Sequence, residues 1–292
     1  MRQTIIKLKI GEIIFALKSP LTQGILFLEQ NYQKFATEEE AQVFLKVHYG
    51  QLPDFAGWRL VFDSGGLWKL FQFRDEYGLG LYSPVIESAP YQATKFKQNF
   101  WVGDIYLNDT NHNHIQRQSI FPYPLPQLLM INILSQGYGL MMHACAVKDD
   151  DQGYLFVGAS GAGKSTIAGL WKTEKKAIVL NDDRVILRHK DGMFWIYGTP
   201  WHGTGKAVSA ESVPLTKIFI LKHALTNQTQ KLKTIDAQAK LLVRSFPTYW
   251  NPLGMEFTIK FLDELVQSFP CYELGFIPDH SLIDYVRWQA SI

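Results

Sequence analysis

The sequence predicts an α/β domain preceded by a smaller β-rich domain, and three observations lead to this fold class. A glycine-rich segment over residues 158–166 follows a short apolar run and precedes a helical pattern. On both sides of that segment, strand-like apolar runs alternate with helical patterns, as in α/β folds. Residues 1–107 instead carry a series of short runs separated by polar or glycine-rich turns, which is typical of a β-rich domain.

The N-terminal domain, residues 1–107, is expected to consist mostly of strands. One helix is expected over residues 37–50, "TEEEAQVFLKVHYG", because Thr37 and Glu40 have the spacing of a capping box. We find no catalytic constellation in this half of the chain. Four of its aromatic side chains are predicted to be core residues rather than a ligand platform, namely Trp58, Trp68, Phe71 and Phe73. The expected strands are "TIIKLKI", "IIFAL", "WRLVF", "LWKLFQF", "GLGLYS" and "FWVGDIYL".

A linker is predicted over residues 108–119, "NDTNHNHIQRQS", because its density of Asn, Asp and Ser disfavours regular structure. His112 and His114 fall in this segment. We interpret them as part of an exposed polar loop rather than as metal ligands, since no third ligand stands nearby in the sequence. The second domain then covers residues 120–292.

The second domain begins with a proline-rich entry into an apolar helix that should end at Gly137 or Gly139. A buried strand, "LMMHACAV", a turn and a second strand, "YLFV", lead into the glycine-rich segment. After the helix that begins "TIAGLW", strands are expected at "AIVL", "MFWIY" and "LTKIFILKH", and helices at "DAQAKLLVRSF" and "MEFTIKFLDELVQSF".

Residues 158–165 match the spacing G-x-x-x-x-G-K-[ST] of a phosphate-binding loop. Its glycines let backbone amides point at one anion, and the following helix adds the positive end of its dipole. Lys164 would neutralise the β- and γ-phosphates, and the Ser165 hydroxyl would ligate Mg²⁺. The sequence therefore predicts ATP or GTP with Mg²⁺, held by Gly158, Ala159, Ser160, Gly161, Ala162, Gly163, Lys164, Ser165 and Thr166.

An acidic pair, Asp182 and Asp183, follows the apolar run "AIVL" by one residue, at the carboxyl end of a strand expected to be adjacent to the loop strand. Ligand sites favour this edge of a sheet. One carboxylate would hold Mg²⁺ while the other accepts a proton from an attacking hydroxyl. His143 either fills the core or orients this pair.

The segment "GTPWHGTGK", residues 198–206, has two readings. His202 and Lys206 would contact substrate or phosphate, with glycines permitting close backbone approach. Alternatively, the segment is a structural turn around a buried Trp201.

His143-Ala144, the hairpin, "GASGAGKST" and "NDD" occur in an order that resembles the catalytic domains of the HPr kinase/phosphorylase family. That fold is similar to ATP-dependent phosphoenolpyruvate carboxykinase. The resemblance covers residues 139–188 and implies a P-loop kinase domain in which His143, Lys164, Ser165, Asp182 and Asp183 are functional, with Asp182 as the base and Asp183 on Mg²⁺ together with Ser165. A segment of the family's E-I-R-G-L-G type is not found, and residues 1–107 do not resemble its regulatory domain. Phosphorolysis and an HPr substrate are therefore not implied.

These observations predict a kinase that transfers the γ-phosphate to a hydroxyl, such as a serine of a protein or peptide. A small-molecule kinase is an alternative, although such chains usually begin with the loop strand. A nucleotide-binding regulatory or accessory protein is a further alternative, but binding alone would not require an acidic pair with a histidine.

Composition excludes several other classes of protein. Lys and Arg number 29 against 27 Asp and Glu, a net charge of +2 without a concentrated basic run, so nucleic acid is not an expected partner. Charged residues interrupt the N-terminal apolar patches, and no segment is apolar enough to suggest a membrane partner. The two cysteines, Cys145 and Cys271, read as buried thiols. These features are typical of a cytoplasmic protein, and a homo-oligomer is compatible with them.

Overall fold

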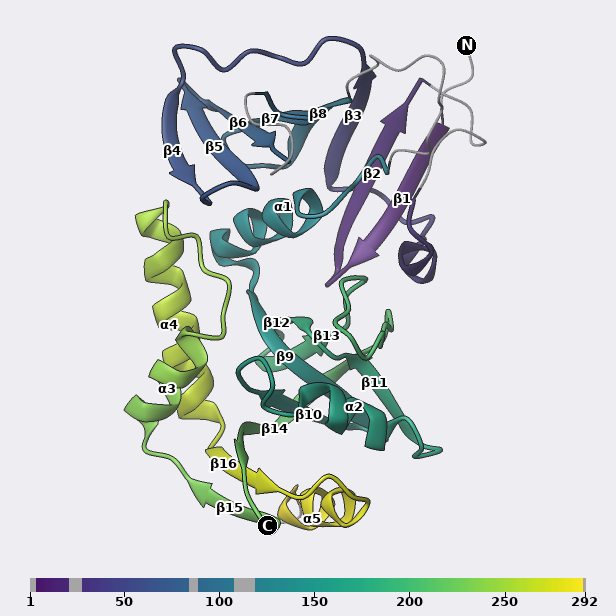
Figure 1. Ribbon diagram of the computed structural model, residues 1–292, viewed down its shortest axis with the longest axis vertical. Coiled ribbons are helices and arrows are strands. Elements are labelled where there is room, and N and C mark those ends of the chain that lie inside the picture. The colour runs from purple at the N-terminus through teal and green to yellow at the C-terminus, as the bar shows by residue number, and fades with distance from the viewer. Residues whose placement is uncertain (1–3, 21–27, 84–88, 108–118, 291–292) are drawn as a thin grey trace. The chain divides into compact units, whose positions relative to one another are not determined.

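The computed structural model describes residues 4–20, 28–83, 89–107 and 119–290. It divides into two compact units, Met1–Ile133 and Leu134–Ile292 (Figure 1). Most of the predicted linker, residues 108–118, lies outside the described residues, and so do both of its histidines. Residues 120–133, which the sequence suggested would open the second domain, belong to the first unit.

The first unit is built on an eight-stranded sheet in the order β1-β2-β3-β8-β7-β6-β5-β4. Neighbouring strands are antiparallel except for the pairs β2–β3 and β3–β8, which are parallel. Phe121, just before α1, packs against Phe15 of the sheet with ring centroids 6.2 Å apart. The elements are β1 (Thr4–Ile10), β2 (Ile13–Ser19), η1 (Gln30–Phe35), β3 (Val43–Tyr49), β4 (Arg59–Asp63), β5 (Trp68–Phe73), β6 (Glu76–Leu81), β7 (Gln92–Lys97), β8 (Val102–Leu107) and α1 (Leu125–Ile133).

The prediction of a helix over residues 37–50 is wrong, because half of that segment is strand β3 and none of it is helical. Val43, Leu45 and Val47 are buried while Phe44 and Lys46 between them are exposed, which is the period of two of a strand. The strand lies between β2 and β8, so pairing on both sides outweighs the local capping signal. The Thr37 hydroxyl instead accepts a hydrogen bond from the Glu39 amide, in a local turn.

The prediction that four aromatic side chains form the core of the first unit is also wrong. Trp58, Trp68 and Phe71 are half-buried, and Phe73 is 45% exposed. They lie on or beside β4 and β5 at one end of the sheet, where β4 is an edge strand with a single neighbour. The rings contact one another in pairs on this surface, as Trp58 and Phe73 do in a tilted arrangement with centroids 5.7 Å apart.

The second unit contains a sheet in the order β10-β9-β12-β13-β14-β16-β15, to which β11 is added beside β9. Strand β10 pairs with β14 as well as with β9, so five strands are joined in a closed series of pairings. The elements are η2 (Leu134–Tyr138), β9 (Leu140–Asp149), β10 (Gln152–Val157), α2 (Lys164–Trp171), β11 (Ala177–Asn181), β12 (Arg184–Lys190), β13 (Met193–Tyr197), β14 (Ser212–His223), β15 (Gln228–Lys231), α3 (Thr234–Leu242), α4 (Pro252–Ser268), β16 (Cys271–Phe276) and α5 (Ser281–Ala290).

Helices cover this sheet on two faces, so the chain has the expected mixed α/β character. Alternate residues of β9 enter two separate cores, Met142 with α3 and α4 and Cys145 with α2 and α5. Helices α3 and α4 lie side by side, with the Gln238 amide donating to the Ile259 carbonyl (Figure 1). The predicted α2, α3 and α4 are confirmed, whereas β15, β16 and α5 were not predicted from the sequence.

The expectation that the acidic pair follows a strand adjacent to the loop strand is wrong. Strand β9 lies between β10 and β11, because the β9–β10 hairpin occupies that side of the loop strand. Past the end of β11 the chain turns and continues as β12, which pairs with the first half of β9 so that Arg184 lies opposite His143. This register brings His143 to the acidic pair.

Both cysteines are buried and form no disulfide, as predicted. Burial raises the pKa of both thiols, that of Cys271 to about 12. Among the described residues, no helix combines the length and apolar character needed to cross a bilayer.

Candidate functional site

The glycine-rich segment forms a loop from Gly158 to Gly163 between the end of β10 and the start of α2. Gly161 and Gly163 adopt φ values of 80° and 103°, in the left-handed region that favours glycine. At Gly163 a Cβ atom would also lie 2.5 Å from Cζ of Phe276. The sequence therefore needs glycine here, both for backbone conformation and for packing.

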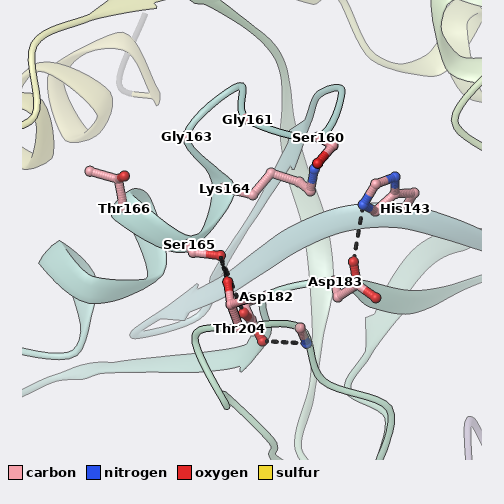
Figure 2. A pocket seen from close by; sticks show the side chains of 11 residues that line it. His143, Ser160, Gly161, Gly163, Lys164, Ser165, Thr166, Asp182, Asp183 and Thr204 are labelled. Atoms are coloured by element: carbon pink, nitrogen blue, oxygen red, sulfur yellow. Dashed lines mark hydrogen bonds and ion pairs between the residues drawn. The ribbon is translucent and has the colours of Figure 1, made fainter.

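The loop forms one wall of a cavity of about 380 Å³. In Figure 2, the side chains of His143 and Asp183 point toward each other. The side chain of Asp182 lies beneath Ser165 in the same view. The cavity therefore gathers side chains from the loop, β9, the β11–β12 turn and the segment after β13. Its lining consists of His143, Ser160, Gly161, Gly163, Lys164, Ser165, Thr166, Asp182, Asp183, Gly203 and Thr204.

Lys164 is buried beneath the loop, and its ammonium group donates to two carbonyls of that loop. The Nζ atom lies 2.8 Å from the Gly158 oxygen and 3.0 Å from the Ala159 oxygen. Burial lowers the pKa of Lys164, and the positive charge of Arg244 acts in the same direction, against the opposing effect of the Asp183 carboxylate. A bound phosphate would supply the negative charge that this partly desolvated ammonium lacks.

Asp182 is only 1% exposed, and backbone amides occupy both of its carboxylate oxygens. Oδ1 accepts from the Gly203 and Ala207 amides at 3.1 and 3.2 Å, and Oδ2 accepts from the Gly205 amide at 2.6 Å. The Ser165 hydroxyl lies 3.5 Å from Oδ2. Asp182 thus fixes the segment 203–207 against the glycine-rich loop.

We expect Asp182→Asn to destabilise the second unit by about 1–3 kcal/mol, because a side-chain NH₂ group would replace one acceptor oxygen and leave buried amides without a partner. Chemical denaturation of the variant measures this loss. Asp191→Asn, at an exposed turn, is the matched control and should unfold with the parental free energy. Equal stability of Asp182→Asn and the parent would show that these amide contacts contribute nothing.

Asp183 is more accessible, with a side-chain exposure of 20%, and each of its carboxylate oxygens has a side-chain partner. Oδ1 lies 3.0 Å from Nε2 of His143, and Oδ2 contacts Nη1 of Arg184. Burial raises the pKa of the Asp183 carboxyl, but the His143 hydrogen bond and the Arg184 charge outweigh burial, and the net pKa lies below its ordinary value. The carboxylate is therefore ionised and oriented toward the cavity.

The oxygen donors beside the loop fit Mg²⁺. Ser165, Thr204 and Asp182 meet there, with the two hydroxyl oxygens 3.1 Å apart, and hard oxygen ligands are those that Mg²⁺ prefers. Within the described residues, no group of three or more His, Cys, Asp or Glu side chains is suited to a metal. An Mg²⁺ ion held together with substrate phosphates needs only one or two carboxylates.

The remaining predicted site residues lie around this cavity rather than in its wall. His202 and Lys206 do not line it, and Nδ1 of His202 lies 2.7 Å from the Gly203 oxygen. Gly158, Ala159 and Ala162 line a second cavity on the other side of the loop. Within the segment 198–206, the residues that line the first cavity are Gly203 and Thr204.

Arg244 was not anticipated from the sequence. It follows α3, and its carbonyl accepts from the His143 amide at 2.6 Å, which places the residue beside the site. Its positive charge also contributes to the lowered pKa of Lys164. An antiparallel bridge between Ser245 and Met142 of β9 brings Arg244 to the site. The sequence pattern does not predict this bridge, because the two segments are far apart in the chain.

No protein-family model matches the chain, and no curated protein matches it. Among solved structures, it is similar to the Hpr(Ser) kinase/phosphatase from Coxiella burnetii, at 11% sequence identity and a TM-score of 0.31. The aligned region covers 52% of this chain and 92% of that one. This is a distant structural relation.

Proposed function

We propose that this protein is a kinase that binds ATP or GTP with Mg²⁺ at the glycine-rich loop and transfers the γ-phosphate to a hydroxyl. The observation that carries the proposal is the contact of His143 and Asp183, whose Nε2 and Oδ1 atoms lie 3.0 Å apart across one cavity from Lys164 and Ser165. A cation, a metal-binding hydroxyl and a carboxylate oriented by a histidine are the groups that phosphoryl transfer requires. Phosphate binding alone would use only the first two.

In this proposal the nucleotide phosphates replace the loop carbonyls as partners of Lys164. The loop amides and the positive end of the α2 dipole hold the phosphates from one side. Ser165 and Asp182 would hold Mg²⁺, which when bound neutralises charge on the β- and γ-phosphates. The asymmetry of the acidic pair supports this role for Asp182, since its oxygens already serve as fixed acceptors beside Ser165.

Asp183 is proposed as the general base and His143 as its positioning residue. The acceptor oxygen forms a bond to the γ-phosphorus, the bond to the bridging β–γ oxygen breaks, and the hydroxyl proton passes to the Asp183 carboxylate. The products are the phosphorylated acceptor and a nucleoside diphosphate. This assignment reverses the one that the family resemblance implies, because the Asp183 side chain is 20% exposed whereas Asp182 is 1% exposed, with backbone amides on both of its oxygens.

Labelled nucleotide tests the proposal. The purified protein is incubated with Mg²⁺ and ATP or GTP labelled in the γ-phosphate, in the presence of serine peptides or small hydroxyl compounds, and transfer to each compound and to water is measured. We expect Mg²⁺-dependent transfer. Binding without transfer to any acceptor or to water would favour a regulatory or accessory protein instead, and absence of binding would overturn both readings.

The lowered pKa of Asp183 gives a further expectation for stability. A carboxyl group whose folded pKa lies below its unfolded value, here ordinarily 3.8, stabilises the fold above that value and loses this contribution as the pH falls through the folded pKa. The difference in unfolding free energy between the parent and Asp183→Asn should therefore be larger at neutral pH than near pH ~3. Denaturant titrations at the two pH values measure it, and a difference independent of pH would contradict the pairing.

A further inference from the structure

A second cavity, of about 420 Å³, lies on the other side of the glycine-rich loop. It opens at the carboxyl ends of β10 and β14, two parallel neighbours, and α3 supplies another of its walls. Ser160 lines both cavities, so the two spaces meet at the loop. Ligands of α/β proteins favour this edge of the sheet.

The lining of the second cavity is apolar at its base and basic at its rim. Val157, Ile220 and Leu221 form the buried part, and the rim carries Lys222, Lys240 and Arg244 together with His223. Among the described residues, no acidic side chain lines this cavity.

One carboxylate lies close to two of these cations. Glu273 lies 3.0 Å from the ammonium of Lys222 and 3.6 Å from that of Lys240. A single carboxylate therefore serves two ammonium groups, and the rim keeps a net positive charge. Such a rim favours an anionic ligand.

Arg244 connects the second cavity to the reaction site. Its main chain contacts His143, and the Phe246 amide donates to the Met141 carbonyl at 3.0 Å, so this segment runs along the start of β9. Arg244 is also near enough to Lys164 to lower its pKa. A ligand in the second cavity would thus lie beside Arg244, whose carbonyl accepts from the amide of His143, the residue that positions the proposed base.

We propose that the second cavity binds the phosphate acceptor and selects one that carries a carboxylate or phosphate near its reacting hydroxyl. This inference rests on the proposed function. The base and ribose of a nucleotide are uncharged and would gain little from three cations, whereas the acceptor hydroxyl must reach Asp183. The anionic group on the rim would hold the acceptor while its hydroxyl points past Arg244 to the γ-phosphate.

Inorganic phosphate is the probe for the rim. The protein is first saturated with Mg²⁺ and a non-hydrolysable ATP analogue that keeps its γ-phosphate, so that the loop is filled, and phosphate is then titrated by calorimetry. We expect one phosphate to bind, with an affinity lowered about tenfold in Lys240→Ala and in Lys222→Ala. Lys240→Arg should keep most of the affinity, since it keeps the charge.

Lys260→Ala is the matched control. Lys260 is an exposed lysine of the same unit that pairs with Glu256 on α4, and it does not line the second cavity. It should bind phosphate as the parent does, and thermal unfolding checks that all variants are folded. Phosphate affinities that are equal in Lys240→Ala, Lys222→Ala and the parent would overturn the proposal. So would an absence of phosphate binding to the filled protein.

Competition distinguishes the sources of the anionic group. Serine peptides with acidic flanks and small hydroxy acids or phosphorylated alcohols are each tested for displacement of phosphate, beside uncharged analogues. Displacement by the charged members of either set supports the proposal and identifies the source, whereas equal displacement by uncharged analogues contradicts it.

The nucleotide analogue supplies its own control. If Lys240→Ala weakened binding of the analogue itself, the cavity would hold the nucleoside and the proposal would be wrong. If the analogue failed to bind the parent, the proposed function would fail instead, and phosphate binding that depends on Lys240 would still be measurable without nucleotide.

Discussion

Asp183→Asn is expected to lower the rate of phosphoryl transfer by ~10² to 10⁴ while leaving nucleotide affinity nearly unchanged, because the amide cannot accept the hydroxyl proton. The substitution keeps the shape of the side chain, and its oxygen still accepts a hydrogen bond from His143. Transfer rates with the acceptor found in the labelling experiment, or with water in its absence, measure the effect. Calorimetry with the nucleotide measures binding separately.

Two further variants make this result specific. His143→Ala should fall between Asp183→Asn and the parent, since orienting a base is worth less than being one. Asp191→Asn removes an exposed carboxylate of the same unit and should transfer at the parental rate. If Asp183→Asn transferred normally while folded Asp182→Asn did not, the assignment implied by the family resemblance would be correct and the one proposed from the geometry wrong.

Lys164→Met should weaken nucleotide binding by ~10- to 100-fold, because charge-assisted hydrogen bonds to a phosphate contribute about 1.5–3 kcal/mol. Methionine keeps the length of the chain beneath the loop while removing the ammonium group. The loss should appear with Mg²⁺-ATP and with inorganic triphosphate alike, since Lys164 contacts only phosphates in this proposal. Calorimetry with both ligands measures it.

Lys175→Met, an exposed lysine after α2, is the matched control for the loss of one charge. A thermal unfolding curve is needed for Lys164→Met, because Lys164 also donates to the Gly158 and Ala159 carbonyls and its removal leaves them without that partner. Parental affinity in a folded Lys164→Met variant would show that the loop does not bind phosphate through this side chain.

The loop and its flanking elements follow from sequence because most of their constraints are local, the packing of Gly163 against Phe276 being an exception. Positive φ at Gly161 and Gly163 favours glycine, the strand before the loop is a short apolar run, and the helix after it begins with a helical pattern. The same local reasoning failed for β3, where a capping pattern at Thr37 competed with pairing to two distant strands. It failed again for Trp58, which precedes β4, and for the aromatic residues of β5. Alternation shows which residues share a face of a sheet, but it does not show whether other residues cover that face.

Sequence alone predicted which residues would carry the chemistry, since the loop motif, the acidic pair and His143 are recognised by type and spacing. Only the tertiary structure decided the different surroundings of the two aspartates, on which the proposed roles rest. The amides that occupy Asp182 come from a segment about 20 residues later in the chain, and Arg244 reaches His143 from beyond α3. Hydrogen bonds and ion pairs between such distant segments depend on which strands pair and in which register. The spacing of apolar residues along the sequence predicts single strands and helices, but it does not predict strand pairing or register. The two aspartates are neighbours in sequence, yet one is buried among amides and the other faces the cavity beside His143.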